Sequence, residues 1–145
     1  MPKITAFSAA TALTDDDLLV TVDAPGGSAA TKKITAANAA LYFAISASST
    51  QTANYTLQLS DAGKTIVLNA ASDKTLTFPP NSSVAFPAGT IVGIEQYGAG
   101  AWLLTAGSGV TLRSYGGATA TAGQYAAATA RKIGTDEWLI SGAVA

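Results

Sequence analysis

Short apolar runs separated by glycine turns are the feature that most constrains the fold of this chain. In residues 89–114 one apolar run ends at Tyr97, and a glycine turn at residues 98–100 follows it. Residues 101–105 form the next run, and a second glycine turn leads into residues 110–112. Aromatic and β-branched runs interrupted by glycine are typical of consecutive strands. We therefore predict an antiparallel meander here, at the centre of a β domain.

Alternating apolar and polar residues predict further strands on both sides of the meander. Before it they occupy residues 55–59, 65–69 and 75–78, the last ended by Pro79 because proline cannot donate to a ladder. After it, alanine favours a helix over residues 122–130, whereas the position among strands favours a strand. We expect a strand that continues through a turn into residues 137–140. Short strands at intervals of about 8–12 residues are typical of a β-sandwich or small barrel.

The first 45 residues differ in composition from this β region. Residues 18–22 and 31–34 flank a stretch whose Pro-Gly-Gly sequence is typical of a turn, which predicts a hairpin. Thr35 is placed to cap a short helix over the alanine-rich residues 36–43. Residues 46–53 are polar without an apolar pattern and are interpreted as a linker. We expect an arm at 1–45, a linker at 46–53 and an antiparallel β domain at 54–145.

The composition argues against most catalytic chemistry. Without cysteine there is no thiolate nucleophile or cysteine-ligated zinc, and without histidine the commonest general base and metal ligand is missing. The Gly-Ser-Gly sequence around Ser108 lacks the outer spacing of a serine nucleophile motif. The carboxylates of Asp15, Asp16 and Asp17 would point apart in a strand or turn, so we expect a solvated turn or cap there. We expect no enzyme, no cofactor and no metal.

Charge is sparse and balanced, with eight basic and nine acidic residues. This provides no basic surface for neutralising phosphates, so we expect no nucleic-acid partner. Charged residues make up 12% of the chain, about half the usual share, which predicts that partners cover much of the surface. No stretch reaches the ~18 apolar residues of a membrane span, and the N-terminus lacks the apolar core of a signal peptide. We expect synthesis in the cytosol and no membrane partner.

Five aromatic residues could provide a stacking platform for sugars. Large aromatics contribute most inside a core or at subunit contacts, so Trp102 and Trp138 are candidates for packing. We assign Trp102, Trp138 and Tyr125 to oligomer packing. Tyr97 and Tyr115 lie beside turns and are better candidates for exposed contacts with a receptor.

From Tyr55 onward the pattern resembles a β module of tailed-bacteriophage virion proteins of the tail-fibre and capsid-decoration type. The motifs that carry it are residues 55–64, 75–79, 89–90, 96–100, 109–112, 124–125 and 137–142. Residues 16–19 and 31–35 also resemble a short element near the start of phage structural proteins. The resemblance implies a non-enzymatic virion protein, made in the host cytoplasm, which forms a homotrimer and docks on the particle through its N-terminal block.

The short distance between arm and β domain differs from a fibre with a long shaft, and it suits a capsid decoration (cement) protein. In that case the partners are copies of the chain and the major capsid protein or another virion protein. The particle-attachment candidates are the apolar residues of the arm: Ile4, Phe7, Leu13, Leu18, Leu19 and Ile34. The alternative is a short tail or head fibre whose β knob binds a host surface receptor or glycan. A second alternative is a carbohydrate-binding β-sandwich unrelated to virions.

Overall fold

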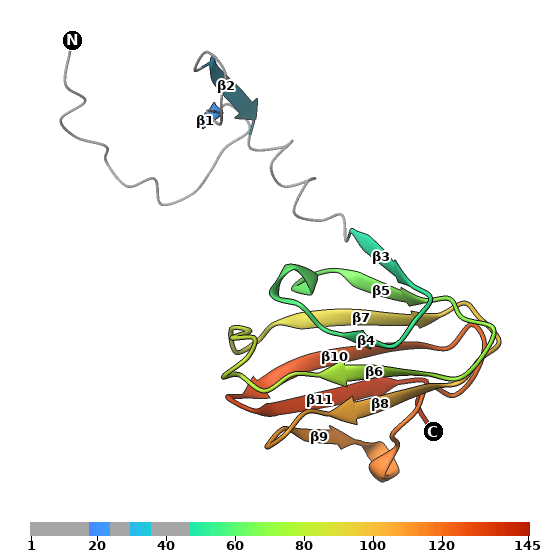
Figure 1. Ribbon diagram of the computed structural model, residues 1–145. Coiled ribbons are helices and arrows are strands. Elements are labelled where there is room, and N and C mark those ends of the chain that lie inside the picture. The colour runs from blue at the N-terminus through green and yellow to red at the C-terminus, as the bar shows by residue number, and fades with distance from the viewer. Residues whose placement is uncertain (1–17, 24–29, 36–46) are drawn as a thin grey trace. The chain divides into compact units, whose positions relative to one another are not determined.

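A computed structural model describes residues 18–23, 30–35 and 47–145 (Figure 1). The chain divides into two units, residues 1–45 and 46–145, and each is described by itself. The expected helix over residues 36–43 and the acidic run at residues 15–17 lie outside the described residues.

The first unit contains a two-stranded antiparallel ladder. Strand β1 (Leu18–Asp23) pairs with β2 (Ala30–Thr35), so that Leu18 lies opposite Thr35 and Asp23 opposite Ala30. This confirms the predicted hairpin. Both strands are rich in β-branched residues, which favour extended backbone.

The second unit is built from two sheets, which confirms the predicted mainly-β fold. In spatial order, the six-stranded sheet comprises β3 (Ser48–Gln51), β5 (Thr65–Leu68), β7 (Ile91–Gln96), β10 (Ala127–Gly134), β11 (Glu137–Gly142) and β9 (Thr111–Ser114). The three-stranded sheet comprises β4 (Tyr55–Thr56), β6 (Lys74–Phe78) and β8 (Trp102–Ala106). Two 3₁₀ turns, η1 (Leu59–Asp61) and η2 (Tyr115–Gly117), lie between strands.

The predicted antiparallel meander is wrong, because most neighbouring strands of this unit run parallel. Strands β3, β5 and β7 are parallel to one another, as are β4, β6 and β8. Strand β9 is parallel to β11, while β10 is antiparallel to both β7 and β11. The glycine turn after Tyr97 therefore does not close a hairpin. It carries the chain from β7 in one sheet to β8 in the other.

Three such sheet-to-sheet connections follow one another, β3 to β4, β5 to β6 and β7 to β8, and we call each an arch. The arches lie at one end of the two sheets (right in Figure 1). The arch at residues 97–101 stacks on the arch at residues 69–73. The backbone N–H groups of Tyr97 and Gly98 donate to the Leu68 carbonyl at 2.8 and 3.1 Å, and Gly100 donates to the Ala70 carbonyl at 2.9 Å.

Side chains complete the hydrogen bonding of the arches. Buried Gln96 donates through Nε2 to the carbonyls of Gly98 and Gly100, both at 3.0 Å, and its Oε1 accepts from the Thr121 hydroxyl. Asp73 Oδ1 accepts from the backbone N–H of Ala101 at 2.9 Å. These bonds satisfy backbone groups that would otherwise be left unpaired where the ladder ends.

Several strand boundaries differ from the sequence-based expectation. Residues 48–51, interpreted as linker, form β3 and pair with β5, because an edge strand needs only one neighbour and tolerates a polar sequence. Strand β4 ends at Thr56, and η1 begins at Leu59, the last residue of the expected strand. In residues 122–130 the strand begins only at Ala127, and its hairpin with β11 is confirmed.

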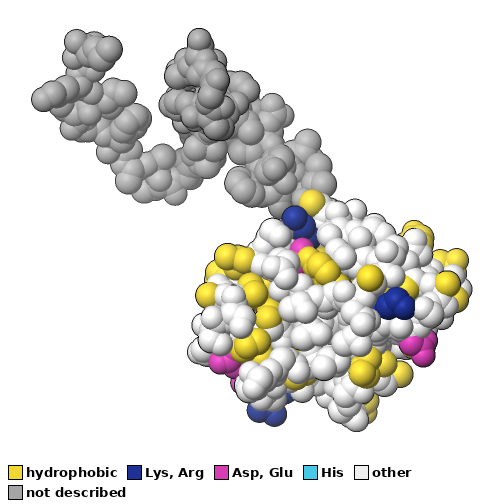
Figure 2. Space-filling view, in the orientation of Figure 1, with side chains coloured by type: hydrophobic (Ala, Val, Ile, Leu, Met, Phe, Trp, Pro, Cys, Tyr) yellow, Lys and Arg dark blue, Asp and Glu magenta, His cyan; other side chains and the backbone are white. Residues whose placement is uncertain are grey.

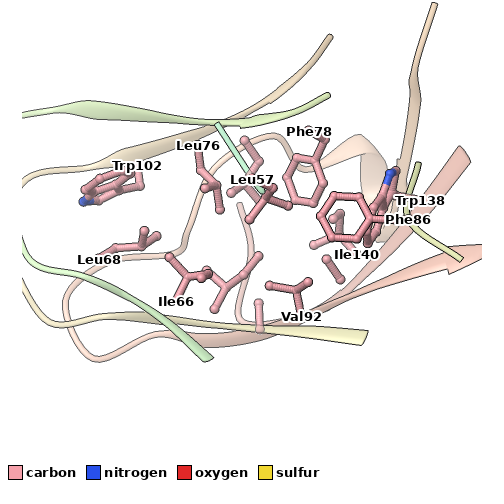
Figure 3. Close-up of a cluster of buried hydrophobic side chains, with 14 of the residues drawn as sticks. Leu57, Ile66, Leu68, Leu76, Phe78, Phe86, Val92, Trp102, Trp138 and Ile140 are labelled. Carbon is pink, nitrogen blue, oxygen red and sulfur yellow. The ribbon is translucent and has the colours of Figure 1, made fainter. Parts of the chain in front are cut away.

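The buried apolar side chains that the structure describes form one core between the two sheets of the second unit (Figure 3). Inward residues of β5, β7, β10 and β11 meet those of β6 and β8. The Trp138 ring packs edge-on against Phe78 and Phe86, with centroid separations of 5.4 and 5.3 Å. Trp102 lies at the opposite end of the cluster. Trp102 and Trp138 are 0% and 1% exposed, so their assignment to oligomer packing is wrong: their burial is within the chain.

Candidate functional site

The structure describes only some of the residues expected to make contacts with partners. Ile4, Phe7 and Leu13 lie outside the described residues. Leu18, Leu19 and Ile34 lie on β1 and β2, of which only the backbone is described. The role of these six in particle attachment stays a prediction. The three candidate tyrosines, Tyr97, Tyr115 and Tyr125, belong to the β domain, and two of them are in contact.

Tyr97 and Tyr125 form an exposed aromatic pair. Tyr97 directly follows β7, and Tyr125 lies two residues before β10, which pairs with β7. Their ring centroids are 5.9 Å apart at 84°, an edge-to-face arrangement. The exposed fractions are 56% for Tyr97 and 73% for Tyr125. Their sequence context predicts oligomer packing for Tyr125 and a receptor contact for Tyr97, and the pairing of β7 with β10 brings the two together.

The backbone at Tyr125 is held in an unfavourable conformation. Its φ of 66° lies in the left-handed region, which costs a bulky residue roughly 1–2 kcal/mol. Its N–H donates to the Gln96 carbonyl at 2.6 Å, and Gln124 Nε2 donates to the Tyr97 carbonyl at 3.0 Å. Such strain persists where surrounding contacts impose it, and it is concentrated at functional sites.

A groove runs beside the tyrosine pair onto the outer face of the six-stranded sheet. The part next to the rings has a volume of about 280 Å³ and is lined by Glu95, Gln96, Tyr97, Tyr125 and residues 126–127. An adjoining hollow of about 370 Å³ shares Glu95 with it and continues over Gly93, Thr129 and Ser141. The small side chains of this row make the hollow. The groove thus offers aromatic rings, one carboxylate and hydroxyl groups to a ligand.

Tyr115 is the most exposed of the large hydrophobic side chains described, at 98%, and it lies on η2. It forms no ring pair with Tyr97 or Tyr125. A further hollow of about 470 Å³ lies along the three-stranded sheet and contains Asn54 and Asp73. Both side chains already accept backbone hydrogen bonds, Asn54 Oδ1 from Thr75 at 3.0 Å and Asp73 Oδ1 from Ala101. Their polar groups serve the fold, so the tyrosine groove is the better candidate site.

Within the described residues, no group of three or more acidic side chains is placed to hold a metal ion. In the same part of the chain, no helix has both the length and the apolar character needed to cross a bilayer.

The chain was compared with protein-family models, curated proteins and solved structures. No family model, no curated protein and no solved structure matches the chain.

Proposed function

We propose that the protein is a non-enzymatic structural protein of a tailed-bacteriophage particle, a trimeric capsid decoration protein attached through residues 1–45. The observation that carries the proposal is the division of the chain into two units. Residues 46–145 complete their own core, with Phe78, Trp102 and Trp138 buried inside it. The described buried apolar side chains all belong to residues 57–140, so we expect that unit to fold without the first 45 residues, which leaves those residues for attachment.

The proposed mechanism is burial of apolar side chains of the arm across several capsid subunits. Binding to the assembled shell stabilises it, because a ligand that prefers one state shifts the equilibrium towards that state. The sparse charge of the chain supports this assignment. Figure 2 shows few, scattered charged side chains on the face in view, as expected for a surface that lies against neighbours.

Deletion of residues 1–45 tests the proposal. We expect the truncated chain to stay soluble and to lose co-sedimentation with capsids that lack the protein, while the full chain binds them. Capsid binding by the truncated chain would overturn attachment through the arm. Light scattering on the purified full chain tests the trimer, and a monomer at micromolar concentration would contradict it.

A second candidate function is recognition of a host surface receptor or glycan by the β domain. The exposed Tyr97–Tyr125 pair beside Glu95, with the strained backbone of Tyr125, favours it, since aromatic faces and carboxylates suit sugar rings with their hydroxyl groups. We expect Tyr97→Ala and Tyr125→Asn to reduce adsorption of the protein to host cells, because asparagine accommodates the left-handed backbone. Tyr115→Ala tests separately the other receptor-contact candidate, which lies outside the pair. Equal adsorption by all variants would exclude this pair from recognition.

A further inference from the structure

Lys132 is a buried lysine whose amine lies against an asparagine amide. It is on β10 with its side chain turned inward, and its exposed fraction is 2%. Its Nζ donates to Asn81 Oδ1 at 2.6 Å and to the Phe86 carbonyl at 2.8 Å. Both acceptors belong to the connection between β6 and β7, so one side chain joins that connection to the six-stranded sheet.

The surroundings of this amine are apolar. The cross-strand neighbour of Lys132 on β11 is Trp138, whose ring packs against Phe86. Within residues 47–145, no carboxylate lies at salt-bridge distance from Lys132; the ion pair found there joins Arg113 and Glu137. Burying an ammonium without a counter-charge is costly. A reaction that converts it into a neutral group would remove that cost.

We propose that Lys132 and Asn81 form an intramolecular isopeptide bond. The 2.6 Å contact and a C=O bond of about 1.2 Å place Nζ within about 3.8 Å of the Asn81 amide carbon. Reacting atoms in a near-attack geometry are about 3–3.5 Å apart, so a small movement of the lysine brings Nζ onto the carbon. Exclusion of water from the site protects the amide from competing hydrolysis.

The reaction exchanges one amide for another and needs no oxidant or external reactant. The lysine ammonium first gives up a proton, and the Nζ lone pair then attacks Cγ of Asn81. The Nζ–Cγ bond forms, the Cγ–Nδ2 bond breaks, and Nδ2 leaves as ammonia after receiving a proton from Nζ. The proton lost first ends on the released ammonia, which departs as ammonium. Side-chain Cγ and Nζ are then joined through a neutral secondary amide.

Asp136 is a carboxylate that is hydrogen-bonded to the backbone of Asn81. It lies in the turn between β10 and β11, and its Oδ1 accepts the backbone N–H of Asn81 at 2.6 Å. We assign it the transfer of the proton from the lysine to the leaving ammonia. A carboxylate that reaches the reacting nitrogens can serve as general base and then as general acid.

The mass of the intact protein tests the bond. We expect the purified full-length chain, kept folded in buffer, to be lighter than its sequence by one ammonia. Protease digestion should give a branched peptide that joins the segments containing Asn81 and Lys132. A folded chain that keeps its full mass, with no branched peptide, would overturn the proposal: Lys132 would then be a buried ammonium held by carbonyl groups only.

Three variants refine the assignment. Lys132→Arg keeps the charge but lacks the nucleophilic amine, so its mass should equal its sequence, whereas Lys64→Arg should still lose ammonia. Asp136→Asn should form the bond more slowly by about a hundredfold, the lower end of the range for losing an acid–base group. An unchanged rate would remove Asp136 from the reaction. The mass of the unaltered chain decides the main proposal even if Lys132→Arg does not fold, and it does not depend on the phage assignment.

Discussion

Tyr55 and Asp61 show how one buried carboxylate is accommodated in this domain. Asp61 is 2% exposed, and its Oδ2 accepts the Tyr55 hydroxyl at 2.8 Å and the Gln58 N–H at 2.7 Å. Burial raises the pKa of Tyr55 to about 12, and the hydrogen bond to Asp61 and its negative charge act in the same direction. The pair fixes η1 against β4, because Asp61 belongs to the first and Tyr55 to the second.

The raised pKa predicts a loss of stability at alkaline pH. The pKa of an unfolded tyrosine is about 10, so the contribution of Tyr55 is complete below about pH 10. Above that pH the unfolded chain ionises first, and the contribution disappears as the pH rises through about 12. Allowing for solvent screening, we expect a loss on the order of 1–2 kcal/mol.

Urea unfolding of the natural chain and of Tyr55→Phe measures this loss. The phenylalanine variant keeps the ring but has no group to titrate. We expect the stability advantage of the natural chain over the variant to shrink between about pH 9 and about pH 12. A constant difference over that range would show that ionisation of Tyr55 is not linked to folding.

At the residue scale, sequence reasoning found the aromatic residues but not their roles. The alternation around Trp102 and Trp138 predicts that both are buried. It is the same for a strand face that packs on a second sheet of the chain and for one that packs on another subunit, so it could not distinguish core packing from oligomer packing. Tyr97 and Tyr125 are 28 positions apart and meet only because Glu95 pairs with Ala127. A left-handed tyrosine leaves no sequence signal, since that conformation is imposed by its surroundings.

At the element scale, the stacked arches explain the glycines after β7. A Cβ built on Gly98 would lie 2.1 Å from the Ala70 carbonyl oxygen, and one on Gly100 would lie 2.3 Å from the Ser72 carbonyl oxygen. We therefore expect Gly98→Ala to lower the free energy of unfolding by about 3 kcal/mol or more, since backbone cannot yield as a side chain can. Chemical denaturation measures this change.

Gly109→Ala is the matched control for the arch. Gly109 has a φ of +78° and nothing within 4 Å of a built Cβ, so alanine there costs only the left-handed backbone, about 1–2 kcal/mol. Equal losses in the two variants would mean that the arches do not pack as closely as described.

The sequence does not show whether a turn joins two strands of one sheet, as in a hairpin, or strands of two sheets, as in an arch. Both need glycine and both join runs of alternating residues, so residues 98–100 predicted a hairpin. The turn at residues 134–136 predicted one correctly, because β10 and β11 are neighbours in one sheet. Parallel pairing depends on contacts between separate arches, and these contacts cannot be predicted from the sequence of one arch.

At the scale of the whole molecule, the position of the core indicates that the β domain folds without the first 45 residues. Every buried apolar side chain described belongs to residues 57–140, within the second unit. Strand β3, the first of that unit, is needed only as an edge neighbour of β5. The polar stretch expected as a linker therefore contributes to the sheet, and a truncation must keep it.

We predict that a chain starting at Ser46 folds alone with the thermal stability of the full protein. Its melting temperature should lie within about 4 °C of the full chain, which corresponds to less than about 1 kcal/mol for a domain of this size. A chain starting at Tyr55 is the comparison: without β3 it leaves the backbone of β5 unpaired and should melt markedly lower. Calorimetry of the three chains at one concentration gives the result. Equal melting of the two truncated chains would show that β3 adds nothing to the sheet. A large drop on removing residues 1–45 would mean that the arm stabilises the β domain, contrary to the division of roles proposed for the two units.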